Sequence, residues 1–213
     1  MRLTALAVFA CALWIASPCM AQQWELGVVA GYGAAKQVAA TRAGQQADAG
    51  FKPGLTVGVL GGHNLYDYVS GEFRYVFRRA DLKVSSGGTE VGFRGRAHVV
   101  HYDLLLFSRK RDEPLRPYAA AGAGIKVYEG RGREAAFQPL NRFAILTRTL
   151  QVKPLVSVGG GIKVKIASGG FLRFELRDYL TPFPENVIAP APGAKVGGWI
   201  HDFVPMVSLT FGF

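Results

Sequence analysis

The last eleven residues, FVPMVSLTFGF from Phe203 to Phe213, decide how the whole chain is interpreted. Every second residue counted back from the end is apolar, and these residues are Phe213, Phe211, Leu209, Val207, Pro205 and Phe203. The residues between them are mostly small or polar. Because successive side chains of a strand point to opposite faces, the alternation predicts a strand with one apolar face. Such a strand is long enough to cross a bilayer when tilted, although a half-buried strand of a soluble sandwich gives the same pattern.

Residues 1–21 have the features of a cleaved export signal. Arg2 provides a positive start, an apolar run extends over residues 4–16, and small residues at 19–21 form a cleavage site. A lipoprotein signal ending at Cys19 is the alternative, which Pro18 makes a poor match. We therefore expect a mature chain of residues 22–213.

The composition of the chain favours a β-barrel. Both cysteines lie at positions 11 and 19, so the predicted mature chain has no thiol for a disulfide or a cysteine metal site. The mature chain has no apolar run of the ~18 residues that a spanning helix needs. With 27 glycines, 19% charged residues and a mean hydropathy of +0.16, the chain is too apolar for disorder. The formal net charge of +10 favours lipid phosphate as the anionic partner of an exported protein, rather than nucleic acid.

Seven further segments show the same alternation and bring the predicted strands to eight. These are Trp24 to Gly33, Leu55 to Asn64, Val69 to Arg78, Arg96 to Phe107, Tyr118 to Tyr128, Lys153 to Lys165 and Leu172 to Arg177. The connections between them alternate between longer and shorter stretches. An even number of strands with this alternation predicts an all-β, antiparallel, up-and-down transmembrane barrel whose ends both lie on the periplasmic side.

The segment Val69 to Arg78 distinguishes a membrane barrel from a soluble one. Phe73 and Tyr75 share one face with further apolar residues, and Glu72 and Arg74 share the other. A soluble barrel, such as a lipocalin-like carrier, would bury the aromatic face. In a membrane the arrangement is reversed, because lipid is the outer solvent.

Together with the export signal and the eight strands, two short motifs carry a resemblance to a known family. They are RPYAAAGAG at residues 116–124 and FGF at residues 211–213. The chain resembles the outer-membrane β-barrel family that includes OmpA-like and OmpX-like proteins, over nearly all of its mature length. The resemblance implies a bacterial outer-membrane location and a C-terminal signal for the outer-membrane assembly machinery, carried here by Val207, Leu209, Phe211 and Phe213. Pro205 departs from a regular strand and suggests a bulge or the outer part of the strand.

The predicted inner face of the barrel is charged. It comprises Glu25, Glu72, Arg74, His101, Asp103, Lys126, Lys163, Lys165, Arg173, Glu175, Arg177 and Asp202. An eight-stranded barrel is just wide enough for its side chains to fill, so we expect these groups to pair across the lumen as a polar plug. A narrow ion path, or a plug gated by pH through His101 and Asp103, is the alternative.

The sequence predicts neither a catalytic nor a metal site and no cofactor. The four histidines, at positions 63, 98, 101 and 201, are scattered and show no metal-ligand spacing. None has a serine two residues later, as we expect in a lipid A deacylase. Ser208 lies too far along an extended strand from His201 to form a triad. We predict a protein that is not an enzyme, with lipid A modification as the alternative.

Arginines in the long connections suggest contacts with anions, because a guanidinium group pairs well with phosphate. The candidates are Arg78, Arg79, Arg131, Arg133 and Arg142. Lipopolysaccharide phosphates and an anionic host or phage surface are the expected partners, and a merely solvated loop surface is the alternative. The overall prediction is a monomeric outer-membrane barrel with a filled lumen and a structural or surface-interaction role, with a small-solute channel as the alternative.

Overall fold

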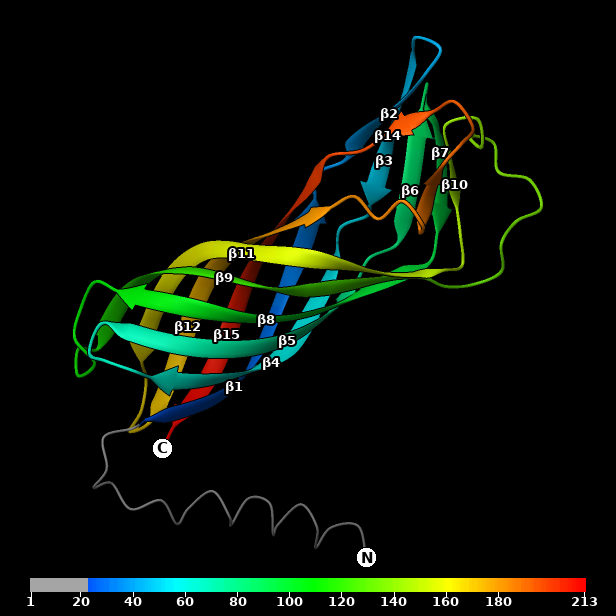
Figure 1. Cartoon of the computed structure of the whole chain (residues 1–213). Coiled ribbons are helices and arrows are strands. Elements are labelled where there is room, and N and C mark those ends of the chain that lie inside the picture. Colours follow the sequence, from blue (N-terminus) through cyan, green and yellow to red (C-terminus); the bar gives the residue numbers. More distant parts are fainter. Residues whose placement is uncertain (1–22) are drawn as a thin grey trace, which may run out of the picture.

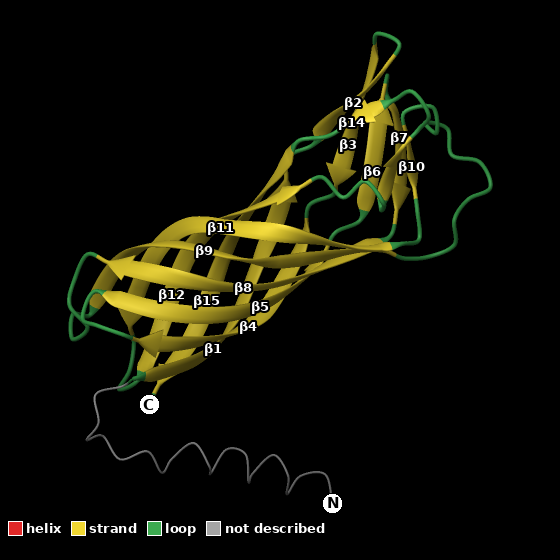
Figure 2. Cartoon of the chain, in the orientation of Figure 1, coloured by secondary structure: helices red, strands yellow, loops and turns green. Residues whose placement is uncertain are grey.

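The computed structural model describes residues 23–213, and the predicted export signal at residues 1–21 lies outside this part. Eight strands form a closed antiparallel barrel in the order β1-β15-β12-β11-β9-β8-β5-β4, so each strand neighbours the next barrel strand of the sequence (Figure 1). They are β1 Trp24–Ala35, β4 Gly54–Asn64, β5 Val69–Arg79, β8 Gly95–Phe107, β9 Leu115–Gly130, β11 Leu150–Lys165, β12 Gly170–Pro182 and β15 Trp199–Gly212. Figure 2 shows strands and loops throughout the described part, which has no helix able to span a membrane.

All eight predicted barrel strands are confirmed, and most are longer than the alternation indicated. The barrel closes between β1 and β15, where Val28 lies opposite Leu209. Pro205 produces no break in β15 and stays in register with Leu176 of β12. The pairing of β15 with β1 is interrupted between Met206 and Phe203, a stretch that includes Pro205. Proline has no N–H to donate to a neighbouring strand, which agrees with an interruption at this point.

The predicted reversal of inside and outside is also confirmed. On β5, the Phe73 side chain is 54% exposed, whereas Arg74 next to it is 0% exposed. Aromatic residues lie toward both ends of the outer face of β1, where Trp24 and Tyr32 are each 55% exposed. A continuous apolar surface of this extent is unfavourable in water and suits the hydrocarbon of a membrane, with aromatic residues at its two interfaces.

The long connections are not the loops that the sequence indicated. Seven further strands lie in them: β2 Val38–Arg42, β3 Gln45–Phe51, β6 Leu82–Ser86, β7 Thr89–Phe93, β10 Ala144–Leu146, β13 Ile188–Pro190 and β14 Lys195–Val196. Five of these form a sheet in the order β14-β2-β3-β6-β7, and β10 pairs with β13. Figure 1 shows them together at the end of the barrel opposite the C-terminus. We call this unit the outer cap.

The outer cap has a hydrophobic core of its own, to which all four long connections contribute. Leu82, Phe143 and Ile188 come from three of them, and each is at most 1% exposed. The core is continuous with the barrel, because Phe51 of the first connection stacks on Tyr128 of β9 with ring centroids 4.9 Å apart. Burial of these apolar side chains explains why the connections are folded against one another.

Candidate functional site

The lumen of the barrel holds a network of ion pairs, which we call the lower network. Four carboxylates face four basic side chains, and every one of these residues is at most 6% exposed. The carboxylates belong to Glu25, Glu72, Asp103 and Glu175, and the basic groups to Lys163, Arg74, Arg173 and Arg177. Buried charges are tolerated only when they are paired and hydrogen-bonded, and each of these eight groups has an oppositely charged partner.

The arginines of β5 and β12 link carboxylates from several strands. Arg74 Nη1 donates to Glu175 Oε1 at 2.5 Å, and Arg74 Nε donates to Glu72 Oε1 at 3.0 Å. Arg177 Nη1 donates to an oxygen of Asp103 at 2.6 Å. The bonds from Arg74 to Glu175 and from Arg177 to Asp103 cross the lumen and tie separate walls of the barrel together, while Arg74 and Glu72 pair within β5.

Glu25 and Glu175 receive further hydrogen bonds. Glu25 accepts from Arg173 Nη2 at 2.5 Å and also from Lys163. The Tyr118 hydroxyl donates to Glu175 Oε2 at 2.8 Å. With such partners these carboxylates are held as bound anions and are not left as free charges along a pore.

A layer of apolar side chains lies above the lower network, on the side of the outer cap. Along the inner face of β5, Val76 follows Arg74 and precedes Arg78, and on β15 Val204 lies between Met206 and Asp202. The members of this apolar belt pack together and are each at most 3% exposed: Val29, Val76, Val99, Leu155, Tyr179, Val204 and Met206. Most of these side chains are aliphatic, so an ion that crossed the belt would lose much of its hydration.

A second charged group, the upper cluster, lies between the apolar belt and the cap. Asp202 accepts a hydrogen bond from Lys126 Nζ at 2.6 Å and another from Arg78 Nη1. Here one carboxylate serves two cations. Arg78 Nε and Nη2 have no hydrogen-bond partner among the described residues.

Most residues predicted for the lumen do lie there, with one correction. Lys165 is exposed, because it lies at the very end of β11, where its backbone N–H donates to Pro114 at the barrel rim. The alternation continues to the last residue of a strand, but the lumen does not.

Two buried arginines correct or extend the sequence prediction. Arg78 was assigned to an anion-contacting loop, yet it is 2% exposed inside the barrel, in phase with Glu72 and Arg74. Arg116 was missed; it is also 2% exposed, and its guanidinium carbon lies 3.8 Å from the centre of the Phe107 ring. Extending the alternation of β9 backwards from Tyr118 would have found it.

The histidines are distributed over different surroundings. His101 lies in the lumen with Nδ1 3.1 Å from Asp103 Oδ1 and Nε2 3.2 Å from the Tyr179 hydroxyl. His98 and His201 lie on the outer wall, within hydrogen-bond distance of Tyr75 and Asp178 respectively. In the part of the chain that the structure describes, none of these histidine contacts is with a serine hydroxyl.

The C-terminal strand presents the predicted assembly residues to the outside. Val207, Leu209, Phe211 and Phe213 are between 41% and 52% exposed, and the polar residues between them point inward. Their role as an assembly signal remains a prediction.

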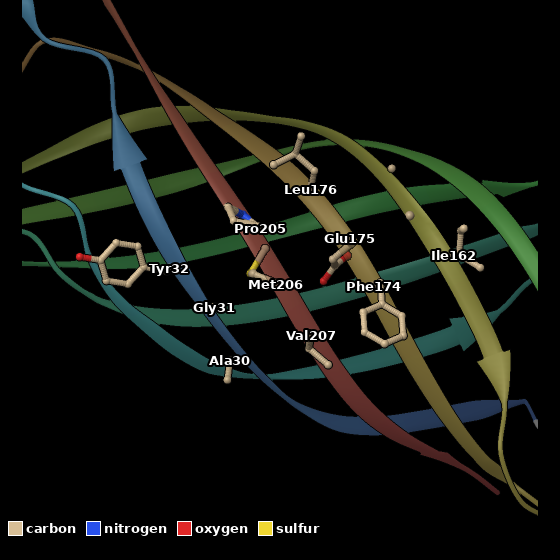
Figure 3. A pocket seen from close by; sticks show the side chains of 12 residues that line it. Ala30, Gly31, Tyr32, Ile162, Phe174, Glu175, Leu176, Pro205, Met206 and Val207 are labelled. Atoms are coloured by element: carbon tan, nitrogen blue, oxygen red, sulfur yellow. The ribbon is translucent and has the colours of Figure 1, made fainter.

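Beside this strand, an outward-facing groove of about 610 Å³ spans β1, β15, β12 and β11. Figure 3 shows Tyr32, Phe174 and Pro205 on its wall. Its lining includes Gly160 and Ala30, which have no side chain and a small side chain respectively.

The basic residues of the long connections fall into two groups. Arg133 and Arg142 are exposed on the outer cap, and the carbonyl of Arg142 accepts a hydrogen bond from Arg42 at 3.0 Å. Arg79 and Arg131 instead line a cleft of about 540 Å³ at the outer rim of the barrel, together with Phe77, Asp81, Arg94, Gly95, Arg96 and Gly132. We call it the rim cleft.

A comparison with protein-family models finds no matching family, and a comparison with curated proteins finds no relative. Among solved structures, Neisserial surface protein A is similar with a TM-score of 0.56 at 10% identity, over 89% of this chain and 97% of that one. The outer membrane protein AlkL, solved in lipid bilayers, gives a TM-score of 0.51 at 10% identity over 94% and 95% of the two chains. The Escherichia coli outer membrane protease OmpT gives 0.50 at 10% identity over 93% and 100%. The closed barrel and these likenesses show that this chain has the fold of the small outer-membrane β-barrel proteins.

Proposed function

We propose that this protein is a bacterial outer-membrane barrel with a sealed lumen, which acts as a structural and surface-interaction protein through its basic outer cap. The observation that carries the proposal is the succession of three barriers inside one barrel. These are the lower ion-pair network, the apolar belt and the cap core above it.

Each barrier opposes the passage of a solute for a different reason. The lower network fills the lumen with paired side chains, and separating them would leave buried charges unpaired. The apolar belt is lined mainly by aliphatic side chains, so an ion that crossed it would lose hydration. The cap core closes the outer end with apolar side chains such as Phe51, which is 3% exposed. A narrow channel would require all three to rearrange.

Several features support the outer membrane as the location. The predicted export signal precedes the barrel, the fold is that of outer-membrane proteins, and the outer wall is apolar between aromatic residues. The terminal residues Val207, Leu209 and Phe211 of β15, and Phe213 directly after it, are exposed and therefore accessible to the assembly machinery. We propose lipopolysaccharide as the principal anionic partner and a monomer as the working form.

Conductance of the refolded protein in planar bilayers tests the sealed lumen. We expect no stable conductance steps, while a 16-stranded porin in the same bilayers, whose lumen is an aqueous channel, conducts. Reproducible steps that disappear when the protein is heat-unfolded before addition would overturn the sealed lumen and establish the channel.

A further inference from the structure

The rim cleft lies where the outer wall changes from apolar to charged. On β5, β8 and β9, the paired positions Phe77, His98 and Val127 form one row across the barrel wall. The next outward-facing row, toward the cap, consists of Arg79, Arg96 and Glu129. The first row, with Phe77 and Val127 on either side of His98, belongs to the edge of the hydrocarbon region, so the charged row lies at the depth of lipid headgroups.

The charges of the rim cleft are unbalanced. Arg79 pairs with Asp81 at 3.1 Å, and Arg96 Nε donates to Glu129 Oε2 at 2.7 Å. Arg94 and Arg131 add two further guanidinium groups. Within residues 23–213, their only ion pair is a longer contact of 3.5 Å between Arg131 Nε and Glu129. Four guanidinium groups therefore face two carboxylates, which leaves two positive charges available for an anion.

The backbone fixes the position of these charges. Arg131 N donates to the Arg94 carbonyl at 2.7 Å, which holds the second connection against the third. Asp81 Oδ1 accepts a hydrogen bond from Gly95 N at 3.0 Å. This bond fixes Asp81, the ion-pair partner of Arg79, at the wall of the cleft. A second cleft of about 280 Å³ shares Arg79, Asp81 and Arg94 and adds Lys52. The basic groups thus come from a folded surface and not from independent loops.

We propose that the rim cleft binds a phosphate group carried by an outer-leaflet lipid, with Arg94 and Arg131 as its principal ligands and the lipid chain lying along Phe77. Planar guanidinium groups match phosphate oxygens. The partly exposed Phe77 directly below Arg79 favours a lipid over a soluble phosphate, because a soluble anion would gain nothing from an apolar floor. This inference rests on the proposed outer-membrane function and identifies one site within the basic surface.

The test compares two double variants with equal loss of charge. The cleft variant carries Arg94→Gln and Arg131→Gln, and the control carries Arg133→Gln and Arg148→Gln, both of which are exposed on the cap and do not line the cleft. Binding of lipid A is measured with refolded full-length protein in phosphatidylcholine nanodiscs, beside dephosphorylated lipid A and inorganic phosphate. Unchanged gel mobility of the unheated proteins checks that both variants are folded.

We expect the cleft variant to bind lipid A at least tenfold more weakly, since a hydrogen bond to a charged group is typically worth about a factor of ten in affinity. The control should bind as the unaltered protein does, and dephosphorylated lipid A and inorganic phosphate should bind weakly to all three. If lipid A binding weakened equally in both variants, the rim cleft would be refuted as a specific site, and the proposed binding through the basic surface as a whole would stand. No weakening in either would overturn both proposals, and inorganic phosphate binding as tightly as lipid A would overturn the lipid as the source of the phosphate.

Discussion

Arg74 and Glu175 meet across the full width of the barrel, with Nη1 and Oε1 2.5 Å apart. Their strands, β5 and β12, are separated by three strands on either side in the closed order, so the pair spans a diameter. Arg173 of β12 reaches back to Glu72 of β5 in the same way. These two reciprocal ion pairs fix the barrel's cross-section and contribute to sealing it.

Removing one partner of the diametric pair should destabilise the barrel strongly. Arg74→Met leaves Glu72 and Glu175 short of a buried cation, and we expect a loss of about 3–5 kcal/mol in the free energy of unfolding. Urea unfolding in detergent, followed by tryptophan fluorescence, measures this. Lys165→Met is the matched control, because the exposed Lys165 should change stability by no more than about 0.5 kcal/mol. Equal effects of the two substitutions would contradict the network's structural role.

The upper cluster predicts a coupling between Asp202 and Arg78. Asp202→Asn leaves two buried cations without a carboxylate and should cost about 3–5 kcal/mol. Adding Arg78→Met removes one of these cations, so the double variant should be more stable than the sum of the single effects predicts, by about 1–3 kcal/mol. Simple additivity in the double-mutant cycle would show that the two side chains do not interact.

The outer cap should loosen without loss of the barrel when its link to the barrel is removed. Phe51→Ala deletes the ring stacked on Tyr128, and such a change in a core costs about 3–5 kcal/mol. We expect faster trypsin cleavage within the cap, while the unheated protein keeps its compact gel mobility. Phe137→Ala, at a side chain that is 70% exposed, should leave the cleavage rate unchanged. Loss of compact mobility in Phe51→Ala would show that the barrel depends on the cap.

A charged residue introduced on the outer wall of the barrel should destabilise the protein in a membrane. Leu176 is 53% exposed on β12, and Leu176→Arg should destabilise the protein in bilayers by about 2–4 kcal/mol if the residue faces the bilayer midplane. Phe137→Arg in the cap should have little effect. A neutral Leu176→Arg would indicate that this wall faces water.

Glu90 provides a prediction of pH dependence outside the membrane. Hydrogen bonds from Lys52 Nζ at 2.6 Å and Lys83 Nζ at 3.0 Å lower the pKa of the Glu90 carboxyl below 4.5. Because the folded pKa is the lower one, this contribution to stability is present above about pH 4.5 and is lost as the pH falls through the folded pKa. In an NMR titration, Lys52→Gln combined with Lys83→Gln should raise the pH at the titration midpoint of the Glu90 carboxyl. An unchanged midpoint would show that the two lysines do not lower the pKa of Glu90.

Local alternation was enough to predict the barrel, because each strand of a membrane barrel separates lipid from lumen at every residue. Glu72, Phe73 and Arg74 were placed on their correct faces from one strand alone. Arg116 could have been found by extending the same pattern. Arg78 was the last residue of its predicted strand, in phase with Arg74, and was misplaced because it was grouped with Arg79 among the residues of the connection.

By itself, then, the sequence determined the eight strands and most of the side chains that face inward, since both follow from a period of two along each strand, while exceptions such as Lys165 lie at strand ends. The tertiary structure alone decided that the four long connections fold into one cap, because their apolar residues are short, interrupted sets that gain stability only by packing against one another. It also decided which charges pair, since partners such as Arg74 and Glu175 are 101 residues apart and meet only when the barrel closes. The rim cleft arises in the same way, where rows from three strands and two connections come to the same height.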